Sequence, residues 1–252
     1  MKILLQISFL GTRYAGYQVQ KGHATVQGAL CEAAEKVFGV KCDITGCSRT
    51  DSGVHANAFY ATVSEHGKCG LETTIPTEKI PLAFVSALPE DISVISAERV
   101  GDSFHARYDV KYKEYIYQIY NRPIPNPFYA DRSLHYPRAI DEKALSRMRE
   151  GAKKFVGTYD FSSYMASGSD IKDTVRTVFD ADVTREGDFI IFKVSANGFL
   201  YNMVRIMAGT LRDVSIGKIS ALSVKEIILS KDRRKAGITA PPDGLYLTKV
   251  VY

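Results

Sequence analysis

The octapeptide Arg49-Thr50-Asp51-Ser52-Gly53-Val54-His55-Ala56 is a short polar stretch between two apolar segments. Ser52-Gly53 predicts a tight turn, because glycine reaches positive φ without a Cβ clash. The turn would present Asp51 at its mouth, with Arg49 close enough to keep the carboxylate ionised. An ionised and positioned aspartate can act as a base, a nucleophile or a cation ligand. The octapeptide alone, however, favours an Asx-type turn with a surface ion pair.

The segments on either side of this loop alternate between strand and helix patterns. Period-two alternation predicts a half-buried strand over residues 2–9, and further strands are expected over 42–47, 57–63 and 92–97. An apolar repeat at helical spacing predicts a helix after Thr25, a suitable N-cap, and before Gly39, which would end it. A second helix is expected over 77–87, ended by Pro89.

The rest of the chain repeats this alternation. Strands are expected over 113–120 and 245–252, a hairpin over 175–183 and 189–196, and helices over 140–155, over 201–211 and from a capping box at Ser223. The pattern predicts an α+β fold of two ferredoxin-like (RRM-like) units that share a largely antiparallel sheet, with helices on one face and an active-site cleft between the units. The expected units are residues 1–100 and 101–252.

Net charge, absent motifs and cysteine spacing limit the classes of protein to which the chain could belong. The 252 residues carry a net charge of +5, which suits an anionic partner without requiring one. The chain has no phosphate-binding loop, dinucleotide fingerprint, zincin helix or nucleophile elbow. Its four cysteines, Cys31, Cys42, Cys47 and Cys69, fit no standard zinc module even with His66, and reduced cytosolic thiols are expected. No apolar run is long enough to span a membrane, so we expect a cytoplasmic protein.

A second candidate site follows Phe104-His105-Ala106-Arg107, on the strand that contains Tyr115. On a strand, Tyr115, Tyr117 and Ile119 share one face. These side chains could simply fill a sheet face, which is the interpretation that we adopt for Tyr117. Alternatively, a tyrosine on a sheet can serve as a stacking platform for an extruded RNA base.

Arg205 and one run of charged residues have open roles. Arg205 lies in an otherwise apolar helical stretch, where it must either be paired or extend to the surface, and the sequence leaves both possibilities open. The run Lys231-Asp232-Arg233-Arg234-Lys235 is most simply a solvated helix end, which is the favoured interpretation for each residue. In an RNA enzyme the same run would contact phosphates.

The octapeptide resembles the signature of the tRNA pseudouridine synthase I (TruA) family, and Phe104–Arg107 followed by Tyr115-x-Tyr117 resembles a second motif of that family. The resemblance extends over essentially the whole chain, through Leu5-Gln6-Ile7, Gly11-Thr12, Gly16–Gln20, Thr25-Val26-Gln27, Leu88-Pro89-Glu90-Asp91-Ile92 and Gly244–Leu247. Two positions depart from the family pattern, Leu10 in place of Asp and Tyr17 in place of Trp. Both are expected to lie away from the nucleophile, in a loop that touches RNA or supports the site.

The resemblance implies a pseudouridine synthase with Asp51 as nucleophile, needing neither cofactor nor metal. By the same resemblance, Tyr115 stacks under the target uridine and Arg205 pairs with Asp51. Arg49 also keeps Asp51 anionic, and it fills the gap or holds the flipped nucleotide. The implied substrate is the tRNA anticodon stem-loop near positions 38–40, and the implied enzyme is a homodimer. A C1′ ester, an addition at C6 and a glycal route all remain open.

Three alternatives remain. A paralogue could act on another RNA, such as rRNA. A non-catalytic RNA-binding protein could use the same sheets and tyrosines, but it would have no use for the Arg49–Asp51 loop. A metal-dependent phosphoesterase would need further carboxylates near Asp51, and none is near in sequence.

Overall fold

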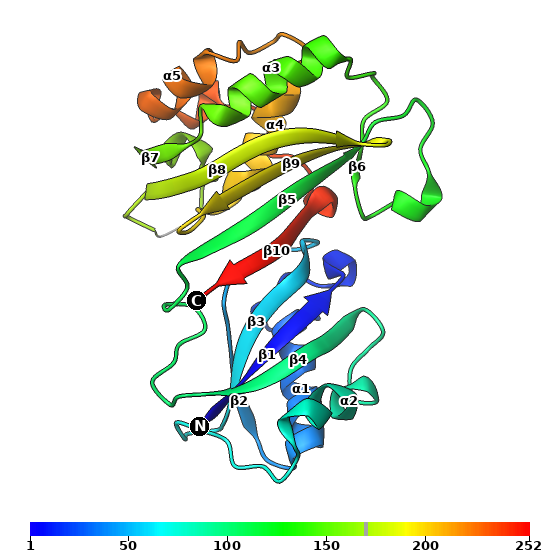
Figure 1. Cartoon of the computed structure of the whole chain (residues 1–252), viewed down its shortest axis with the longest axis vertical. Coiled ribbons are helices and arrows are strands. Elements are labelled where there is room, and N and C mark those ends of the chain that lie inside the picture. The colour runs from blue at the N-terminus through cyan, green and yellow to red at the C-terminus, as the bar shows by residue number, and fades with distance from the viewer. Residues whose placement is uncertain (169–170) are drawn as a thin grey trace. The chain divides into compact units, whose positions relative to one another are not determined.

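The computed structural model describes residues 1–168 and 171–252 (Figure 1). The chain forms two compact units, the first made of Met1–Lys111 with Leu247–Tyr252 and the second of Tyr112–Tyr246. The described residues contain ten strands and five α-helices, which confirms the predicted α+β class. The predicted cleft and shared sheet concern the relative placement of the units and stay predictions.

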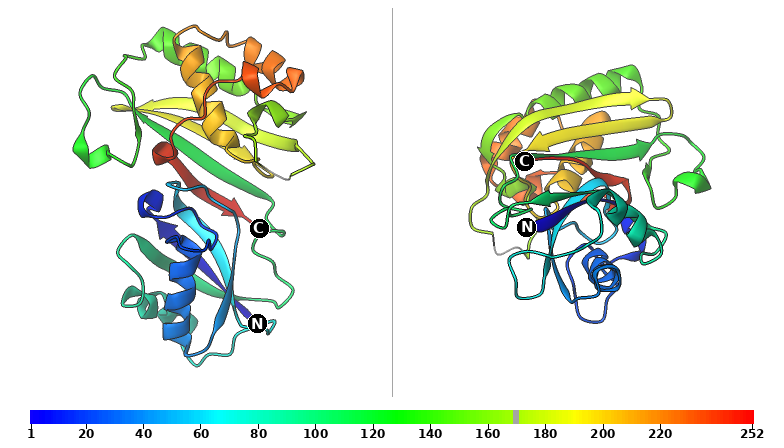
Figure 2. Two further views of the ribbon diagram at one scale, coloured as in Figure 1. Left: turned by 180° about the vertical axis from the view of Figure 1, so that it is seen from behind. Right: turned by 60° about the horizontal axis from the view of Figure 1, so that its bottom comes forward.

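The first unit has a four-stranded antiparallel sheet in the order β4-β1-β3-β2. Its elements follow the chain order β-α-β-β-α-β, the ferredoxin-like pattern that the sequence predicts. Helices α1 and α2 cover one face of the sheet (Figure 2). The elements are β1 (Lys2–Phe9), α1 (Val26–Phe38), β2 (Cys42–Gly46), β3 (His55–Glu65), α2 (Ile80–Val85) and β4 (Ile92–Val100).

The second unit has an antiparallel sheet in the order β5-β9-β8-β7, with the two-residue strand β6 parallel to β5. Helices α3 and α4 pack against each other and lie on one face of this sheet (Figures 1 and 2). The elements are β5 (Tyr112–Tyr120), β6 (Leu134–His135), α3 (Glu142–Lys153), β7 (Gly157–Asp160), β8 (Val175–Glu186), β9 (Phe189–Ala196), α4 (Met203–Ser215) and α5 (Ser223–Ser230). Strand β10 (Leu245–Val251) begins in the second unit and ends in the first.

Pairing within the first sheet brings three chain segments to one end of it. Phe9, the last residue of β1, pairs with Ala56 at the start of β3 and with Ile92 at the start of β4. Because neighbouring strands run antiparallel, the segment after β1 must meet the segments that precede β3 and β4. The Asp51 loop is the segment before β3, so the sheet register alone places it beside the loop that follows β1.

The sequence signals predict both ends of α1 correctly, whereas the structure differs from the predictions at α2 and α5. The Thr25 hydroxyl accepts from the Gly28 amide and Gly39 adopts the left-handed conformation, which confirms both ends of α1. The helix predicted over 77–87 is shorter, because Pro81 has no N–H to donate and the residues before Ile80 form a 3₁₀ turn instead.

The short helix predicted to start at Ser223 is confirmed, but the capping box predicted for its first turn is wrong. Helix α5 begins at Ser223 itself, and the Ser220 hydroxyl accepts from the Ser223 amide at 3.2 Å. Ser220 therefore performs the capping role that the sequence pattern assigned to Ser223, three residues earlier. The short strands β6 and β7 were not predicted, because two to four residues give no readable periodicity.

Candidate active site

The loop over residues 48–54, here called the Asp51 loop, contains the tight turn that the sequence predicts. Gly53 has φ +79°, and the Val54 amide donates to the Asp51 carbonyl at 3.2 Å. Asp51 is partly exposed, whereas Thr50 and the residues from Gly53 to Ala56 are buried. The turn therefore presents a partly exposed Asp51, next to the exposed Ser52, between the buried Thr50 and the buried residues Gly53 to Ala56.

Hydrogen bonds from the loop that follows β1 hold the Asp51 loop. The Tyr17 amide donates to the Thr50 carbonyl at 3.1 Å. The Tyr14 carbonyl accepts from the Gly53 amide at 3.3 Å and from the Ser52 hydroxyl at 3.2 Å. These bonds reach the residues immediately before and after Asp51, so they fix the backbone from which its side chain extends.

Two glycines allow the backbones to approach this closely. A Cβ on Gly16, which has φ +89°, would lie 2.6 Å from the Thr50 carbonyl oxygen, and one on Gly11 would lie 2.0 Å from the Val54 carbonyl oxygen. The Gly11 amide also donates to Nδ1 of the fully buried His55 at 2.9 Å. The Gly11-Thr12 and Gly16-Tyr17 stretches therefore pack directly against the backbone of the Asp51 loop.

The expectation that Tyr17 lies away from the nucleophile is wrong for its backbone, which bonds to the residue next to Asp51. Its ring is buried and stacks on Phe59 with centroids 4.4 Å apart, and its hydroxyl has no hydrogen-bond partner among the described residues. Leu10, the other departure, donates its amide to the Asp91 carbonyl at 2.9 Å. Both departures therefore lie in the loop that supports Asp51.

Arg49 is exposed on the Asp51 loop, where a side chain that contacts RNA must be. Its expected influence on the Asp51 carboxylate stays a prediction.

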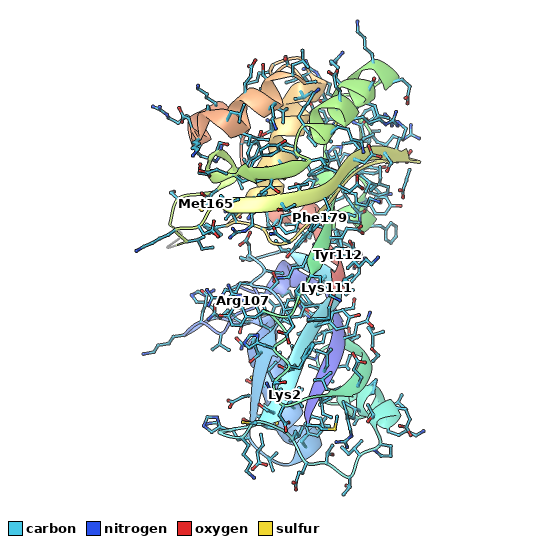
Figure 3. The ribbon with its side chains drawn as sticks, turned by 60° about the vertical axis from the view of Figure 1, so that its left-hand side comes forward. Lys2, Arg107, Lys111, Tyr112, Met165 and Phe179 are labelled. Atoms are coloured by element: carbon cyan, nitrogen blue, oxygen red, sulfur yellow. The ribbon has the colours of Figure 1, made fainter. Side chains whose placement is uncertain are left out.

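The Phe104-His105-Ala106-Arg107 motif has a structural role in the first unit. Lys2, which is labelled in Figure 3, donates to the Phe104 carbonyl at 2.9 Å. The Ala106 carbonyl accepts from the Tyr252 hydroxyl at 2.9 Å.

Tyr115 lies on the buried face of β5 in the second unit, as the alternation predicts. Tyr115, Tyr117 and Ile119 are all buried. Tyr117 is fully buried, and its hydroxyl donates to a backbone carbonyl at 2.8 Å, which confirms its structural interpretation. Tyr115 is 6% exposed and meets the ring of Phe199 edge-on, with centroids 5.1 Å apart and an interplanar angle of 84°.

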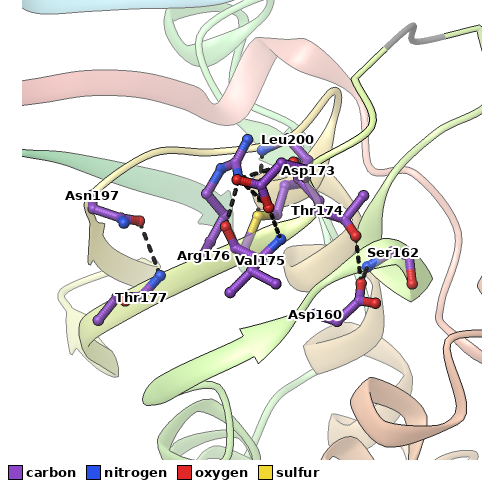
Figure 4. A network of polar contacts seen from close by, with 10 residues as sticks. Asp160, Ser162, Asp173, Thr174, Val175, Arg176, Thr177, Asn197 and Leu200 are labelled. Carbon is purple, nitrogen blue, oxygen red and sulfur yellow. Dashed lines mark hydrogen bonds and ion pairs between the residues drawn. The ribbon is translucent and has the colours of Figure 1, made fainter. Parts of the chain in front are cut away.

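Phe199 is a residue that sequence reasoning left without a role. It follows Asn197, whose side-chain oxygen accepts from the Thr177 amide at 2.9 Å (Figure 4). The Asn197 amide returns a hydrogen bond to the Thr177 carbonyl at 3.1 Å. These bonds fix the end of β9 against β8, and they place Phe199 beside Tyr115. The sequence gives Phe199 no signal beyond its position shortly before Arg205.

Arg205, on the first turn of α4, is partly buried and paired. Its Nε donates to the Ala240 carbonyl at 2.7 Å, and one Nη donates to the Asn202 side-chain oxygen at 2.7 Å. The Ala240 amide donates in turn to the Arg205 carbonyl at 3.1 Å. The side chain is therefore oriented within the second unit, which decides against a freely extended surface arginine. Its expected pairing with Asp51 stays a prediction.

The run over residues 231–235 is largely engaged within the chain. Lys231 pairs with Asp160 at 2.9 Å, and Asp160 also accepts from a neighbouring threonine and a serine amide (Figure 4). Arg233 donates to the carbonyl four residues later at 2.8 Å, and Arg234 pairs with the intervening aspartate at 2.9 Å. The favoured interpretation of a helix end therefore fits these three residues.

Metal ligands are not grouped in the described part of the chain. Among residues 1–168 and 171–252, no three His, Cys, Asp or Glu side chains lie together in a way that could hold an ion. All four cysteines are free thiols, and Cys69 is exposed whereas Cys42 and Cys47 are buried. The zinc set considered from the sequence, with His66, therefore has no counterpart in these described residues.

The close approach at Gly16 can be tested by its stability cost. Gly16→Ala and Gly22→Ala both place a side chain at positive φ in the same loop, but a Cβ on Gly22 meets no atom within 4 Å. We expect Gly16→Ala to lose at least about 2 kcal/mol more than Gly22→Ala, because its Cβ overlaps the Thr50 carbonyl. The difference should lower the melting temperature by a further ~4–8 °C. Equal melting temperatures would show that the two loops do not touch here.

Comparison with known proteins gives the chain a family. A family model described as tRNA pseudouridine synthase matches residues 6–109 and 152–252. The tRNA pseudouridine synthase A of Thermoanaerobacter sp. (strain X514) is 46% identical over 252 residues, which cover 99% of both chains. Those of Caldicellulosiruptor saccharolyticus and Bacillus licheniformis are 44% and 41% identical, covering 99% and 100% of this chain and 99% of each relative.

One solved structure shows a weaker likeness. The structure titled "Crystal Structure of a Cbf5-Nop10-Gar1 Complex" aligns with 97% of this chain and 48% of that chain at 13% identity, with a TM-score of 0.38, which is too low to support an argument. The relatives belong to the family that the octapeptide resembles. Their similarity to this chain extends over its whole length. On the strength of the matched segments and these identities, the chain belongs to the tRNA pseudouridine synthase family.

Proposed function

We propose that Asp51 is the nucleophile with which this enzyme isomerises uridine to pseudouridine in tRNA. The observation that supports this proposal is the Asp51 loop itself, a partly exposed carboxylate on a turn held on both sides by backbone hydrogen bonds. A fixed nucleophile saves the entropy of ordering it in each turnover, and small displacements of reacting groups are costly. An Asx-type surface turn would not need such backing.

The reaction breaks the N1–C1′ bond of uridine and forms a C5–C1′ bond, so it is an isomerisation without net oxidation. In the simplest route, the Asp51 carboxylate attacks C1′ and the uracil leaves with the electron pair of the N1–C1′ bond. The uracil then turns, C5 attacks C1′, and the carboxylate is released. The C5 proton is lost and N1 gains a proton, which balances the reaction. Addition of Asp51 at C6 and a glycal route remain alternatives to this sequence.

Three further residues have proposed roles toward the base, the flipped nucleotide and the Asp51 carboxylate. A uridine inside a folded RNA must be extruded before an enzyme can reach it. We assign the stacking of that base to Tyr115, whose ring is already supported by Phe199. Arg205 is held by Asn202 and the Ala240 carbonyl. Its proposed role is to pair with the Asp51 carboxylate and keep it ionised. Arg49, which is exposed, is assigned to the flipped nucleotide or to the gap that it leaves.

The choice of tRNA position and the assembly state belong to the proposal. By resemblance we expect isomerisation in the anticodon stem-loop near positions 38–40, by a homodimer in the cytoplasm. No helix in the described ranges 1–168 and 171–252 is long and apolar enough to cross a membrane. A paralogue acting on rRNA would isomerise uridines elsewhere, and a non-catalytic RNA-binding protein would isomerise none.

Mapping pseudouridine at single-nucleotide resolution in an unmodified tRNA tests the nucleophile and the target together. The wild-type protein should form pseudouridine within positions 38–40. Asp51→Asn should lower the single-turnover rate by at least about 10³-fold, equivalent to roughly 4 kcal/mol of transition-state stabilisation, because an amide cannot replace the carboxylate. Affinity for tRNA should stay within about twofold, since the amide has the same shape.

Asp43→Asn is the matched control, because Asp43 is a half-exposed carboxylate on β2 that bonds to His66. This control should keep the wild-type rate. An Asp51→Asn rate within about tenfold of wild type would remove Asp51 from the chemistry. Pseudouridine formed only in rRNA would replace the substrate and leave the nucleophile assignment in place.

Substitutions at Tyr115 separate stacking from proton transfer. If the ring only stacks, Tyr115→Phe should change the rate modestly, whereas Tyr115→Leu should lower it by about ten- to a hundredfold, the worth of one base–aromatic contact. Collapse of the Tyr115→Phe rate with unchanged affinity would instead identify the phenol as a proton relay. Tyr117→Phe, which removes a buried hydrogen bond two residues away, serves as the control. Wild-type kinetics from both Tyr115 variants would place the base elsewhere.

A further inference from the structure

Asp91 is a nearly buried carboxylate at the same end of the first sheet as the Asp51 loop. It precedes β4 in the Leu88–Ile92 motif, and its side chain is 10% exposed. One carboxylate oxygen accepts from the Tyr14 hydroxyl at 2.6 Å. The other binds Nε and Nη2 of Arg13, each at 2.7 Å. Asp91 therefore holds two consecutive side chains of the loop that follows β1.

Tyr14 connects Asp91 to the Asp51 loop. Its phenol donates to Asp91, while its carbonyl accepts from the Gly53 amide and the Ser52 hydroxyl. Burial, and next the hydrogen bond to Asp91, raise the pKa of Tyr14 above its usual value, so the phenol stays protonated and remains a donor. The two ends of one residue thus bond to both the carboxylate of Asp91 and the turn that presents Asp51.

The charges around Asp91 explain why a carboxylate is tolerated at this position. A nearly buried carboxylate needs a paired cation and hydrogen bonds to be stable. Arg13 supplies the cation, and its own side chain is 70% exposed. Without Asp91, the hydroxyl of Tyr14, a residue 8% exposed, would lose its acceptor, and a buried donor without an acceptor is unfavourable. Tyr14 would then be expected to shift, and its carbonyl with it.

We propose that Asp91 is a positioning residue for the isomerisation, acting through Tyr14 on the backbone of the Asp51 loop. This inference rests on the proposed role of Asp51 as nucleophile. Asp91 itself need not touch the RNA. Its loss should lower the rate of the chemical step on bound tRNA, because a nucleophile that moves by about 1 Å can lose as much as a hundredfold in rate. The affinity for tRNA should change little.

Tyr14→Phe is the most direct test, because it removes the bond to Asp91 and keeps the ring and the backbone carbonyl. Single-turnover rates on saturating tRNA and dissociation constants should be measured well below the melting temperature. We expect the rate to fall by about tenfold or more, with the dissociation constant within about twofold of wild type. Tyr252→Phe is the matched control, since it removes a tyrosine bond to the Ala106 carbonyl in the same unit. It should keep the wild-type rate.

A double-mutant cycle tests the path from Asp91 to Asp51. Ser52→Ala removes the hydroxyl that donates to the Tyr14 carbonyl. If Tyr14 transmits the effect, the rate loss of Tyr14→Phe with Ser52→Ala should be smaller than the product of the two single losses. Losses that multiply would contradict the path. Asp91→Ala removes the acceptor of the Tyr14 hydroxyl, so its single-turnover rate should fall as that of Tyr14→Phe does. If Asp91→Ala does not fold, the Tyr14 and Ser52 variants decide the question alone.

Failure of this inference is distinguishable from failure of the proposed nucleophile. If Asp51→Asn is inactive while Tyr14→Phe matches Tyr252→Phe, the positioning role is wrong and the nucleophile assignment stands. If Asp51→Asn keeps the wild-type rate, the nucleophile assignment is wrong, and with it the basis of this inference. A fall in tRNA affinity with an unchanged rate would make Tyr14 and Asp91 part of the RNA-binding surface instead.

Discussion

The hydrogen bonds between the loop after β1 and the Asp51 loop are the constraint on which the rest of the first unit's site depends. The antiparallel register brings the two loops to one end of the sheet, because Phe9 pairs with Ala56. Register alone does not bring backbones into contact. Gly16 allows the two backbones to come into contact, since any Cβ at this position would overlap the Thr50 carbonyl oxygen. The candidate nucleophile therefore extends from a backbone that is held on both sides.

The second unit uses backbone groups in the same way. A Cβ on Gly209 of α4 would lie 1.9 Å from the Ile238 carbonyl oxygen, so the segment before β10 runs directly against the helix. This packing places Ala240 beside Arg205. Two hydrogen bonds join the residues, one from the Arg205 side chain and one from the Ala240 amide. Arg205 is thus oriented by a carbonyl and an amide side chain in its own unit, and this fixed orientation is what its proposed role toward a carboxylate requires.

The sequence predicted features that depend on local patterns and missed those that depend on distant backbone contacts. The turn at Gly53, the ends of α1 and the buried face of β5 were all predicted. Glycine conformation, helix capping and strand alternation each depend on residues that are close together in the sequence. The support that Tyr17 gives to Thr50 was not predicted, because an amide-to-carbonyl bond leaves no trace in side-chain type. Phe199 was missed as a partner of Tyr115 for a related reason, since its contact depends on how β8 and β9 pair. Physical patterns drew attention to Asp51, Tyr115 and Arg205, but the roles expected of them came from resemblance to a family.

Amide hydrogen exchange at Tyr17 and Gly53 measures the central constraint most directly, because both amides donate across the contact between the two loops. If the Asp51 loop is held as described, both amides should exchange within about tenfold of the slowly exchanging amides of the β1–β3 pair, although both lie outside the strands. The exposed Gly22, in the same loop as Tyr17, provides the reference for rapid exchange. Exchange of Tyr17 and Gly53 as fast as that of Gly22 would contradict the account, because Asp51 would then lie on an unsupported surface turn.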